Sequence, residues 1–519
     1  MFSAAATGGE KTPFPAAVRQ TLNDMEAVMH IALIALLIVL LGILLVCAVR
    51  ARMLRRPGRR YPTPDPVDGE TAKHAADSLS AVIKFKTINH GDPAKRDASA
   101  FRSLSAYLQA RYPLFHRAAE MERVAEFSLV YHLKGRTAKD PFLFCAHQDV
   151  VPAEGNWEHG PFSGEIAEER VWGRGALDCK STLVCLLEAA ENMLKEGRTP
   201  PRDIYFAFGH DEESGGQEGA ASIVRYFAEK RLYFKLVLDE GPRIYQDFIQ
   251  VPKPQALIGV SEKGALSVRL STGSAGGHAA TPPRHTALGV LAEAICRVEY
   301  RPMPLRMNSV FQAFIRKMAP YLGFSDRMMI ANPFFFKRFL YKKFAKDPIL
   351  SAQMRTTIAA TMASAGTAPN VLPGRAEATL NIRPVHGDTC AGVLEHLGDL
   401  TNGLGVSVEK LQGEEAAAVS DHTGTVYRLL SAVIHASFGD VIVAPYIMPG
   451  GTDGRKYEGL AENVFRFCPV LGTKDEFSRV HAVNESIRTE SLGSAVRFYE
   501  TLFLSGDMLE EETPPREAE

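Results

Sequence analysis

Histidines and carboxylates stand where apolar segments of this chain end. The run 142–146 leads into His147 and Asp149, and a later run, 204–208, is followed by the adjacent Glu212 and Glu213. Because side chains two apart on an extended segment point the same way, His147 and Asp149 can act together. A carboxylate beside a metal-bound histidine fixes the tautomer and orientation of the ring. The pattern therefore favours metal-assisted chemistry.

Three more side chains extend this pattern. Asp178 lies in a glycine-flanked loop before a helix, Asp239 ends a third apolar run, and His481 follows far downstream. Each alone has a structural explanation; Asp, for instance, is a favoured helix N-cap. Together, two histidines and three carboxylates suit two divalent ions, with one carboxylate bridging and a water between the ions as nucleophile. Zinc is favoured, with manganese and cobalt as alternatives.

A mostly parallel sheet with helices on both faces is predicted to position these residues, which makes the fold class α/β. Predicted strands cover 142–145, 204–208 and 236–238, and predicted helices cover 71–83, 98–112, 181–195, 423–436 and 491–503. Loops at the carboxyl ends of parallel strands are where such folds place their chemistry.

A change of pattern predicts an inserted lid domain of the ferredoxin-like type. Its order is strand 265–272, helix 287–298, strands 356–362 and 375–383, helix 389–400 and strand 406–411. An added segment, 303–350, carries Met307, Phe311, Phe314, Ile315 and Met318 at helical spacing and the cluster Phe334–Phe336. We interpret it as the core of a helical subdomain. The alternative is an apolar surface that contacts a hydrophobic substrate or covers the site against a bilayer.

The N-terminal region predicts a transmembrane helix. Residues 31–49 are uncharged and apolar, and at about 1.5 Å per residue they can span a hydrocarbon core of about 30 Å. Arginines follow, where a signal peptide would have small residues at a cleavage site. The same arginines place the following domain in the cytoplasm by the positive-inside rule, with the lumenal or extracellular side as the alternative.

The predicted organisation has an N-terminal segment 1–26, a transmembrane helix 27–49, a linker 50–68, catalytic parts 69–261 and 414–505, a lid domain 262–413 with the insert 303–350, and a disordered acidic tail 506–519. The 59 Lys and Arg residues against 60 Asp and Glu residues argue against a nucleic-acid partner. Seven scattered cysteines without a C-x-x-C pair favour isolated thiols over a disulfide framework.

Six ordered motifs resemble the di-zinc metallopeptidase family that includes aminoacylase, acetylornithine deacetylase, glutamate carboxypeptidase and carboxypeptidase S. They are Ala146-His-Gln-Asp-Val-Val-Pro-Ala153, Gly173-Arg-Gly-Ala-Leu-Asp-Cys-Lys180, Gly209-His-Asp-Glu-Glu213, Asp239-Glu-Gly241, Gly276-Gly-His-Ala-Ala-Thr-Pro-Pro283 and Gly450-Gly-Thr-Asp-Gly-Arg455. The segments 260–264, 355–361 and 369–373 look most like the branch that contains the N-fatty-acyl-amino-acid synthase/hydrolases and carboxypeptidase S.

The resemblance implies a role for each residue. It implies His147 and Asp239 on one zinc, Glu213 and His481 on the other, and Asp178 as the bridge. It implies that Asp149 orients His147 and that Glu212 is the general base. His278 is similar to the histidine that closes over the cleft and stabilises the oxyanion. Asn370, Arg383 and Arg455 match positions suited to the substrate's backbone and carboxylate.

The predicted function is that of a membrane-anchored di-zinc amidohydrolase for N-acyl, chiefly N-fatty-acyl, amino acids, which could also run in the direction of synthesis. The alternative is a carboxypeptidase or dipeptidase acting on short peptides. A non-catalytic receptor or scaffold is disfavoured because every expected ligand and the base are present. The expected partners are a small molecule with a free carboxylate and a membrane, and the oligomeric state stays open.

Overall fold

The computed structural model describes residues 16–55 and 60–511. Parts of the predicted N-terminal segment, linker and tail, at 1–15, 56–59 and 512–519, lie outside these described residues. The chain forms two compact units. One contains the N-terminal helix together with residues 319–340, and the other contains nearly all of the remaining chain.

The smaller unit is built on α1 (Ala16–Met53). Within α1, the stretch Asn23–Met53 is long and apolar enough to cross a membrane, as a retained anchor or a signal sequence. The helix continues to Met53, so the first residues of the predicted linker 50–68 are helical. Helix α9 (Phe324–Ala331) packs against α1 in this unit.

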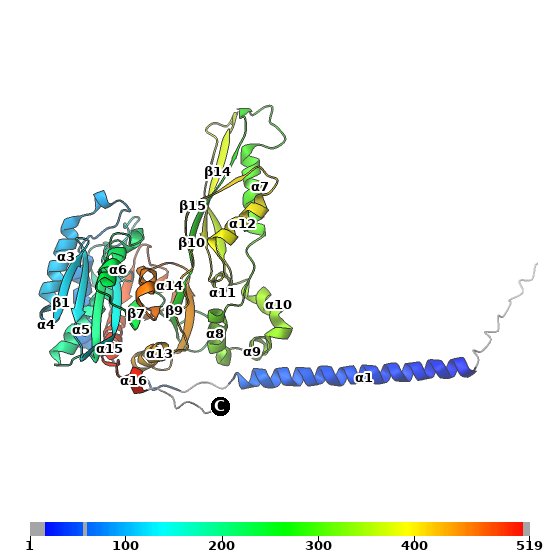
Figure 1. Ribbon diagram of the computed structural model, residues 1–519, viewed down its shortest axis with the longest axis horizontal. Coiled ribbons are helices and arrows are strands. Elements are labelled where there is room, and N and C mark those ends of the chain that lie inside the picture. Colours follow the sequence, from blue (N-terminus) through cyan, green and yellow to red (C-terminus); the bar gives the residue numbers. More distant parts are fainter. Residues whose placement is uncertain (1–15, 56–59, 512–519) are drawn as a thin grey trace, which may run out of the picture. The chain divides into compact units, whose positions relative to one another are not determined.

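The larger unit contains a ten-stranded sheet of mixed, mostly parallel character (Figure 1). Its order is β1 (Ala119–Val124), β2 (Ser128–Leu133), β6 (Arg202–Gly209), β3 (Thr137–His147), β7 (Leu236–Asp239), β17 (Val464–Arg466), β9 (Gln255–Glu262), β8 (Ile244–Tyr245) and β18 (Leu471–Gly472), with β16 (Ile442–Met448) paired to β9. The neighbours β6, β3, β7 and β17 run parallel. The predicted fold class is confirmed.

Successive strand residues point to opposite sides of the sheet, and here the residues on both sides are apolar. Helices therefore cover both faces of the sheet. On β3, Phe142 and Phe144 belong to one apolar cluster, whereas Leu143 and Cys145 belong to another. The first cluster packs α2 (Gly69–Ile83), α5 (Lys180–Lys195), α13 (Thr425–Phe438) and α15 (Thr489–Leu504); the second packs α6 (Ala220–Glu229) and η4 (Asp453–Leu460). The remaining elements at this sheet are α3 (Ala98–Arg111), α4 (Pro113–Ala118), α14 (Lys474–Phe477) and the small sheet β19 (Ser486–Arg488), β5 (Arg170–Trp172) and β4 (Ile166–Ala167).

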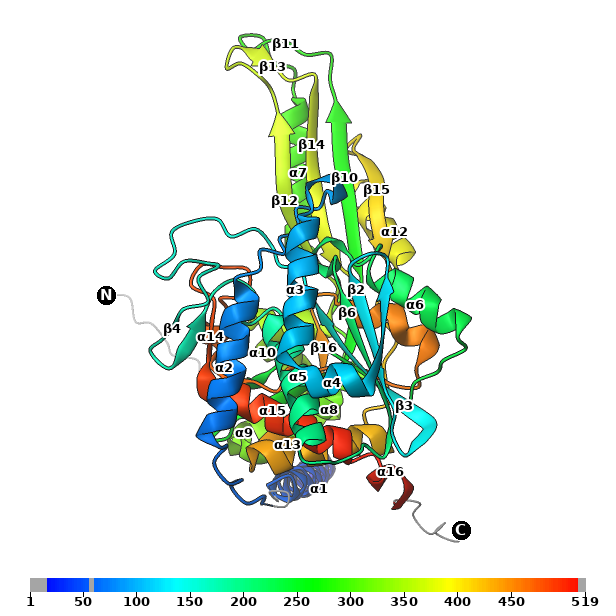
Figure 2. The same ribbon diagram turned by 90° about the vertical axis from the view of Figure 1, so that its left-hand side faces the viewer.

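A four-stranded antiparallel sheet has the predicted β-α-β-β-α-β element order. Its elements are β10 (Ala265–Gly273), α7 (Ala287–Tyr300), β12 (Thr357–Ala365), β14 (Arg375–Arg383), α12 (Cys390–Thr401) and β15 (Ser407–Glu414). The sheet order β12-β14-β10-β15 is that of a ferredoxin-like sheet, and the two helices share one apolar cluster with it. The short strands β11 (Gly277–His278) and β13 (Val371–Leu372) form the tip of this sheet in Figure 2.

The segment added between α7 and β12 is helical. It contains α8 (Ser309–Met318), η3 (Ala319–Tyr321), α9, α10 (Pro333–Phe344) and α11 (Pro348–Met354). In α8 the predicted apolar residues Phe311, Phe314, Ile315 and Met318 are buried, whereas Phe334 and Phe335 of α10 are exposed. At the C-terminal end of the described chain, α16 (Met508–Glu511) is helical, which differs from the disorder predicted for 506–519.

Candidate metal centre and active site

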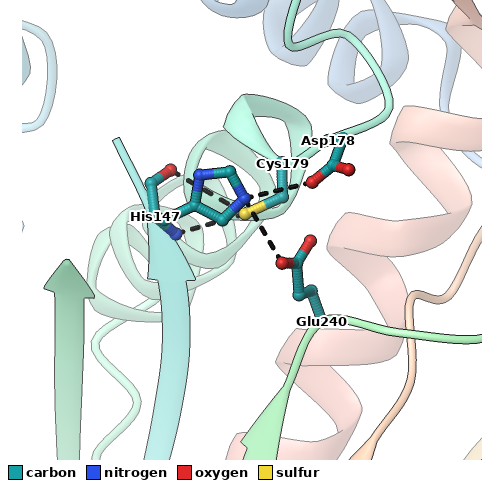
Figure 3. A group of neighbouring side chains, drawn as sticks. All are labelled: His147, Asp178, Cys179 and Glu240. Carbon is teal, nitrogen blue, oxygen red and sulfur yellow. Dashed lines mark hydrogen bonds and ion pairs between the residues drawn. The ribbon is translucent and has the colours of Figure 1, made fainter. Parts of the chain in front are cut away.

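His147 lies at the carboxyl end of β3 and is buried. Its Nδ1 is 2.9 Å from the carbonyl oxygen of Asp149, which can only accept, so Nδ1 carries a proton and donates. Its Nε2 lies 3.0 Å from Asp178 Oδ1 and 3.3 Å from Glu240 Oε1. Figure 3 shows the three side chains pointing toward one another. The backbone thus fixes one ring nitrogen and leaves the other facing carboxylates.

Asp178 stands between two histidines. Its second oxygen, Oδ2, is 3.2 Å from His481 Nε2, and His481 Nε2 is also 3.1 Å from Glu213 Oε2. Each oxygen of Asp178 therefore contacts a different imidazole. This is the arrangement that a bridging carboxylate between two ions requires.

Two groups of donor atoms meet at Asp178, and within each group all the atoms lie within 4.8 Å of one another. One group is His147, Asp178, Cys179 and Glu240, and the other is Asp178, Glu213 and His481. Imidazole and carboxylate donors in such numbers suit divalent ions such as zinc. Because the groups share a carboxylate, the residues present fit a pair of ions.

Glu240, and not the predicted Asp239, contributes its carboxylate to this cluster. Asp239 is buried, and its Oδ2 accepts a hydrogen bond of 2.6 Å from the Gly454 amide. Val237, two residues earlier, packs with Tyr457 on the face covered by η4, and Asp239 points to the same face. Glu240 points the other way, toward His147. Sequence reasoning missed Glu240, although its position next to Asp239 was a usable signal.

Cys179 supports the backbone of His147. Its sulfur accepts a hydrogen bond of 3.2 Å from the His147 amide and lies 3.8 Å from the His147 carbonyl oxygen. Burial raises the pKa of this thiol well above its usual value, so it stays neutral. These contacts assign Cys179 a structural part in the loop.

Asp149 connects His147 to the loop that carries the adjacent glutamates. Its Oδ1 lies 3.4 Å from His147 Nδ1 and accepts from the Glu212 amide at 3.2 Å. Its Oδ2 accepts from the Glu213 amide at 3.1 Å and from Asn89 Nδ2 at 2.8 Å. One fully buried carboxylate thereby fixes both a histidine and the two glutamates that face it.

A second buried support was not predicted from the sequence. Glu485 Oε1 accepts from the amides of Leu177 and Asp178 at 2.7 and 3.2 Å, and its Oε2 is 2.6 Å from Arg174. Arg174 also donates to the carbonyl oxygen of His481 at 3.2 Å. The pair ties the Asp178 loop to the His481 loop. The only sequence signal was an acidic residue four positions after His481.

Burial and neighbouring charges shift the pKa values of two side chains in the cluster. Burial, reinforced by the charges of Glu240 and Asp453 and opposed by His147, raises the pKa of Glu212 well above its usual value. Hydrogen bonds that the His481 ring donates to the Asp178 and Glu213 carboxylates raise the pKa of His481 to about 10. A carboxyl group that takes up a proton readily is suited to general acid–base work. The role of Glu212 as general base stays a prediction.

The other predicted residues lie apart from the cluster. His278 is exposed on β11, opposite Val371, and its Nδ1 accepts from the Ala280 amide at 3.0 Å. The Asn370 carbonyl oxygen accepts from the Ala279 amide at 3.0 Å, so His278 and Asn370 share the tip of the four-stranded sheet.

The two predicted arginines lie where the sheets join. Arg383 ends β14, opposite Thr357. Arg455 lies 2.9 Å from Glu414 Oε2 and donates to the Glu415 carbonyl oxygen at 2.6 Å. Arg383 is thus the last residue of β14, and Arg455 contacts the last residue of β15. Their contacts with a substrate stay a prediction.

Comparison with known proteins places this chain among hydrolases. A family model described as peptidase family M20/M25/M40 matches residues 143–505. The chain is 36% identical over 478 residues to a probable carboxypeptidase S-like 2 of Dictyostelium discoideum, covering 89% of this chain and 91% of that protein. It is 32% identical over 440 residues to the N-fatty-acyl-amino acid synthase/hydrolase of Homo sapiens, covering 83% and 87%.

Solved structures agree on the fold. An M20 family metallo-carboxypeptidase from Sulfolobus solfataricus superposes with a TM-score of 0.61 at 20% identity, covering 83% of this chain and 99% of that chain. Human carnosine dipeptidase 1 gives a TM-score of 0.61 at 16% identity, covering 85% and 96%. With the family model matched over most of the chain and the donor cluster in place, this protein belongs to the M20 peptidase family and is a hydrolase of the metallopeptidase type.

Proposed function

We propose that this protein is a membrane-anchored two-metal amidohydrolase that cleaves the amide bond of N-acyl amino acids, chiefly those with a fatty acyl chain, and that can also form it. The observation that carries the hydrolytic part is Asp178, whose two oxygens face His147 and His481 with Glu212 and Glu213 alongside. Relatives named as N-fatty-acyl-amino acid synthase/hydrolases support the substrate class.

The residues that would hold the ions are His147, Glu240 and Asp178 on one side and Asp178, Glu213 and His481 on the other. Two zinc ions are proposed, with manganese or cobalt as alternatives. Bound there, such ions lower the pKa of a water molecule and polarise the scissile carbonyl group. Asp149 keeps His147 in the tautomer that presents Nε2.

Glu212 carries the proton in this proposal. It takes a proton from the attacking water and returns it to the amide nitrogen as the carbon–nitrogen bond breaks, which releases a carboxylate and an amine. Hydrolysis and condensation use the same proton path in opposite directions. His278 would stabilise the oxyanion once the tip of the four-stranded sheet approaches the cluster. Asn370, Arg383 and Arg455 would hold the substrate's free carboxylate and backbone.

The anchor in this proposal is α1. Arginines in its last turn, Arg50 and Arg52, favour a cytoplasmic position for the rest of the chain by the positive-inside rule. Alkaline carbonate extraction of membranes tests the anchor, since a retained helix keeps the chain in the pellet. Protease protection of sealed vesicles tests the side, and full protection of the hydrolase from added protease on the cytoplasmic face contradicts our proposal.

The substrate class is tested with the purified full chain by liquid chromatography. N-oleoyl-phenylalanine, N-acetyl-phenylalanine and a dipeptide ending in phenylalanine share one leaving amino acid and differ only in the acyl part. We expect the highest kcat/KM for the oleoyl compound. Hydrolysis of the dipeptide without turnover of the oleoyl compound would overturn the lipid assignment.

A carboxypeptidase acting on short peptides is the second candidate. The relative that supports it is the carboxypeptidase S-like protein with 36% identity. Both candidates need the same cluster, so the substrate comparison alone separates them. A matched Glu212→Gln variant reports contaminating peptidase activity in either case.

A further inference from the structure

The added helical segment exposes an unusual set of aromatic side chains. In α8 the phenylalanines are buried, as a packed helix requires. In α9 and the first part of α10 four of them are not: Phe324, Phe334, Phe335 and Phe339 are 53%, 89%, 52% and 63% exposed, and the exposed basic residues Lys337 and Arg338 lie among them on α10. Phe344, at the end of α10, is buried. We call the six exposed side chains the insert face. Exposed apolar groups of this density mark a binding surface.

This face belongs to the same compact unit as α1. Helix α9 packs against α1, and Asn332, directly after α9, donates a hydrogen bond of 3.1 Å to the carbonyl oxygen of Cys47. Cys47 is buried, whereas the apolar side chains of α1 from Met25 to Val46 are exposed. The added segment therefore contacts α1 near its C-terminal end, where Arg50 and Arg52 also lie.

The position of this contact along α1 indicates the depth at which the added segment would lie in a bilayer. A hydrocarbon core of about 30 Å takes about 20 helical residues, so a span that begins near Ala27 ends near Val46. Cys47 then lies at the boundary between acyl chains and headgroups. Because Asn332 holds α9 at Cys47, the phenylalanines of α10 that follow it begin at the same level.

We propose that the insert face lies in the membrane–water interface beside α1 and binds anionic phospholipid. Phenylalanine is among the side chains that interfacial helices bury at the boundary of headgroups and acyl chains, and each Lys or Arg near an anionic surface adds about 1 kcal/mol of attraction. At this depth the surroundings of the rings are lipid headgroups and acyl chains, which favours lipid over a soluble protein as the binding partner. The inference rests on the proposed membrane anchoring and adds a second, peripheral contact to it.

Tryptophan fluorescence in vesicles tests the inference on the full chain, which contains two Trp residues whose signal can be subtracted. Phe334→Trp places a reporter on the insert face. Tyr300→Trp is the matched control, because Tyr300 is 85% exposed but lies at the end of α7. In phosphatidylcholine vesicles with brominated acyl chains, we expect at least about twofold stronger quenching at position 334 than at position 300.

Charge is tested by adding phosphatidylserine to the same vesicles. Quenching at position 334 should increase, and Arg338→Glu should remove the increase, whereas Arg301→Glu, an exposed control site, should not. Equal quenching at positions 334 and 300 overturns the inference. A signal that depends on protein density and not on bromine identifies a second copy of the chain as the occupant, which also overturns it.

The anchor is checked separately on the same sample. If carbonate extracts the unsubstituted chain, or if its mass shows that the N-terminal helix has been removed, the proposed anchoring itself fails. If the chain stays in the membrane with its N-terminus intact and position 334 is not quenched, only the insert face is wrong.

Discussion

The donor cluster and the tip of the four-stranded sheet are built in opposite ways. At the cluster, two of the donor residues are held by buried carboxylates: Asp149 supports His147, and Glu485 supports the loop of Asp178. At the tip, His278 is exposed on a two-residue strand with one hydrogen bond from a neighbouring amide. The cluster is therefore held in place before a substrate binds, whereas in the proposed mechanism the tip has to move to take part.

The largest effect is expected at the cluster. Glu212→Gln removes the proton carrier without removing a proposed ligand, so kcat should fall by about 100- to 10,000-fold. Metal content measured by plasma mass spectrometry should be unchanged. Loss of both activity and metal would make Glu212 a ligand, and unchanged activity would remove it from the mechanism.

The tip should give the next largest effect. His278→Ala should lower kcat by about 100- to 1,000-fold, the cost of losing an oxyanion partner, while the metal content stays the same. His285, also exposed and seven residues later, is a control, and His285→Ala should retain activity. If both variants are fully active, the tip does not contribute to the reaction.

The choice between the adjacent acidic residues gives a sharper test of the cluster. Removal of a residue that only supports a metal ligand lowers metal affinity by about 10- to 100-fold. Glu240→Ala removes a proposed ligand itself, so it should weaken metal binding by at least about 100-fold. Asp239→Asn, which disturbs the hydrogen bonds from the Glu240 and Gly454 amides, should weaken metal binding by about tenfold. Chelator competition measures both, and the reverse order would return Asp239 to the role predicted from the sequence.

The support of the cluster should have a smaller effect. Glu485→Gln keeps the shape of the side chain and weakens its contacts with Arg174 and the Asp178 amide. We expect metal affinity to fall by about 10- to 100-fold, with activity restored by excess metal. Glu476→Gln, which removes another buried carboxylate paired with arginine, is the control. Activity that excess metal fails to restore would indicate misfolding.

The pH dependence of metal binding is expected to be about tenfold per pH unit. Without metal, His481 has its pKa raised to about 10, so its proton stabilises the fold fully below about pH 6.5, and that stabilisation is lost as the pH rises through about 10. A metal must displace this proton, so apparent affinity should rise by about tenfold per pH unit from 7 to 9. Chelator titration at several pH values checks this; a flat profile contradicts it.

Much of the fold was accessible from the sequence because its elements carry strong periodic signals. The predicted strand 375–383 matches β14, and the predicted helix 181–195 differs from α5 by one residue. The insert was harder. Helix α8 buries its phenylalanines and α10 exposes Phe334, Phe335 and Phe339, although both segments are rich in phenylalanine and basic residues. Composition cannot separate these cases, because burial depends on what packs against each helix.

The sequence by itself predicted that His147, Glu212 and Glu213 belong to one site, since strand ends and the loops after them meet at one edge of a parallel sheet. Asp178 and His481 were added by their joint occurrence with these residues and by the resemblance of the motifs. Only the tertiary structure decided between Asp239 and Glu240. Asp239 ends β7 and Glu240 follows it directly, and successive side chains there face opposite ways. The amide of Gly454 lies on one side and His147 on the other. The position of Gly454, more than 200 residues downstream, therefore helps to determine which carboxylate lies in the cluster.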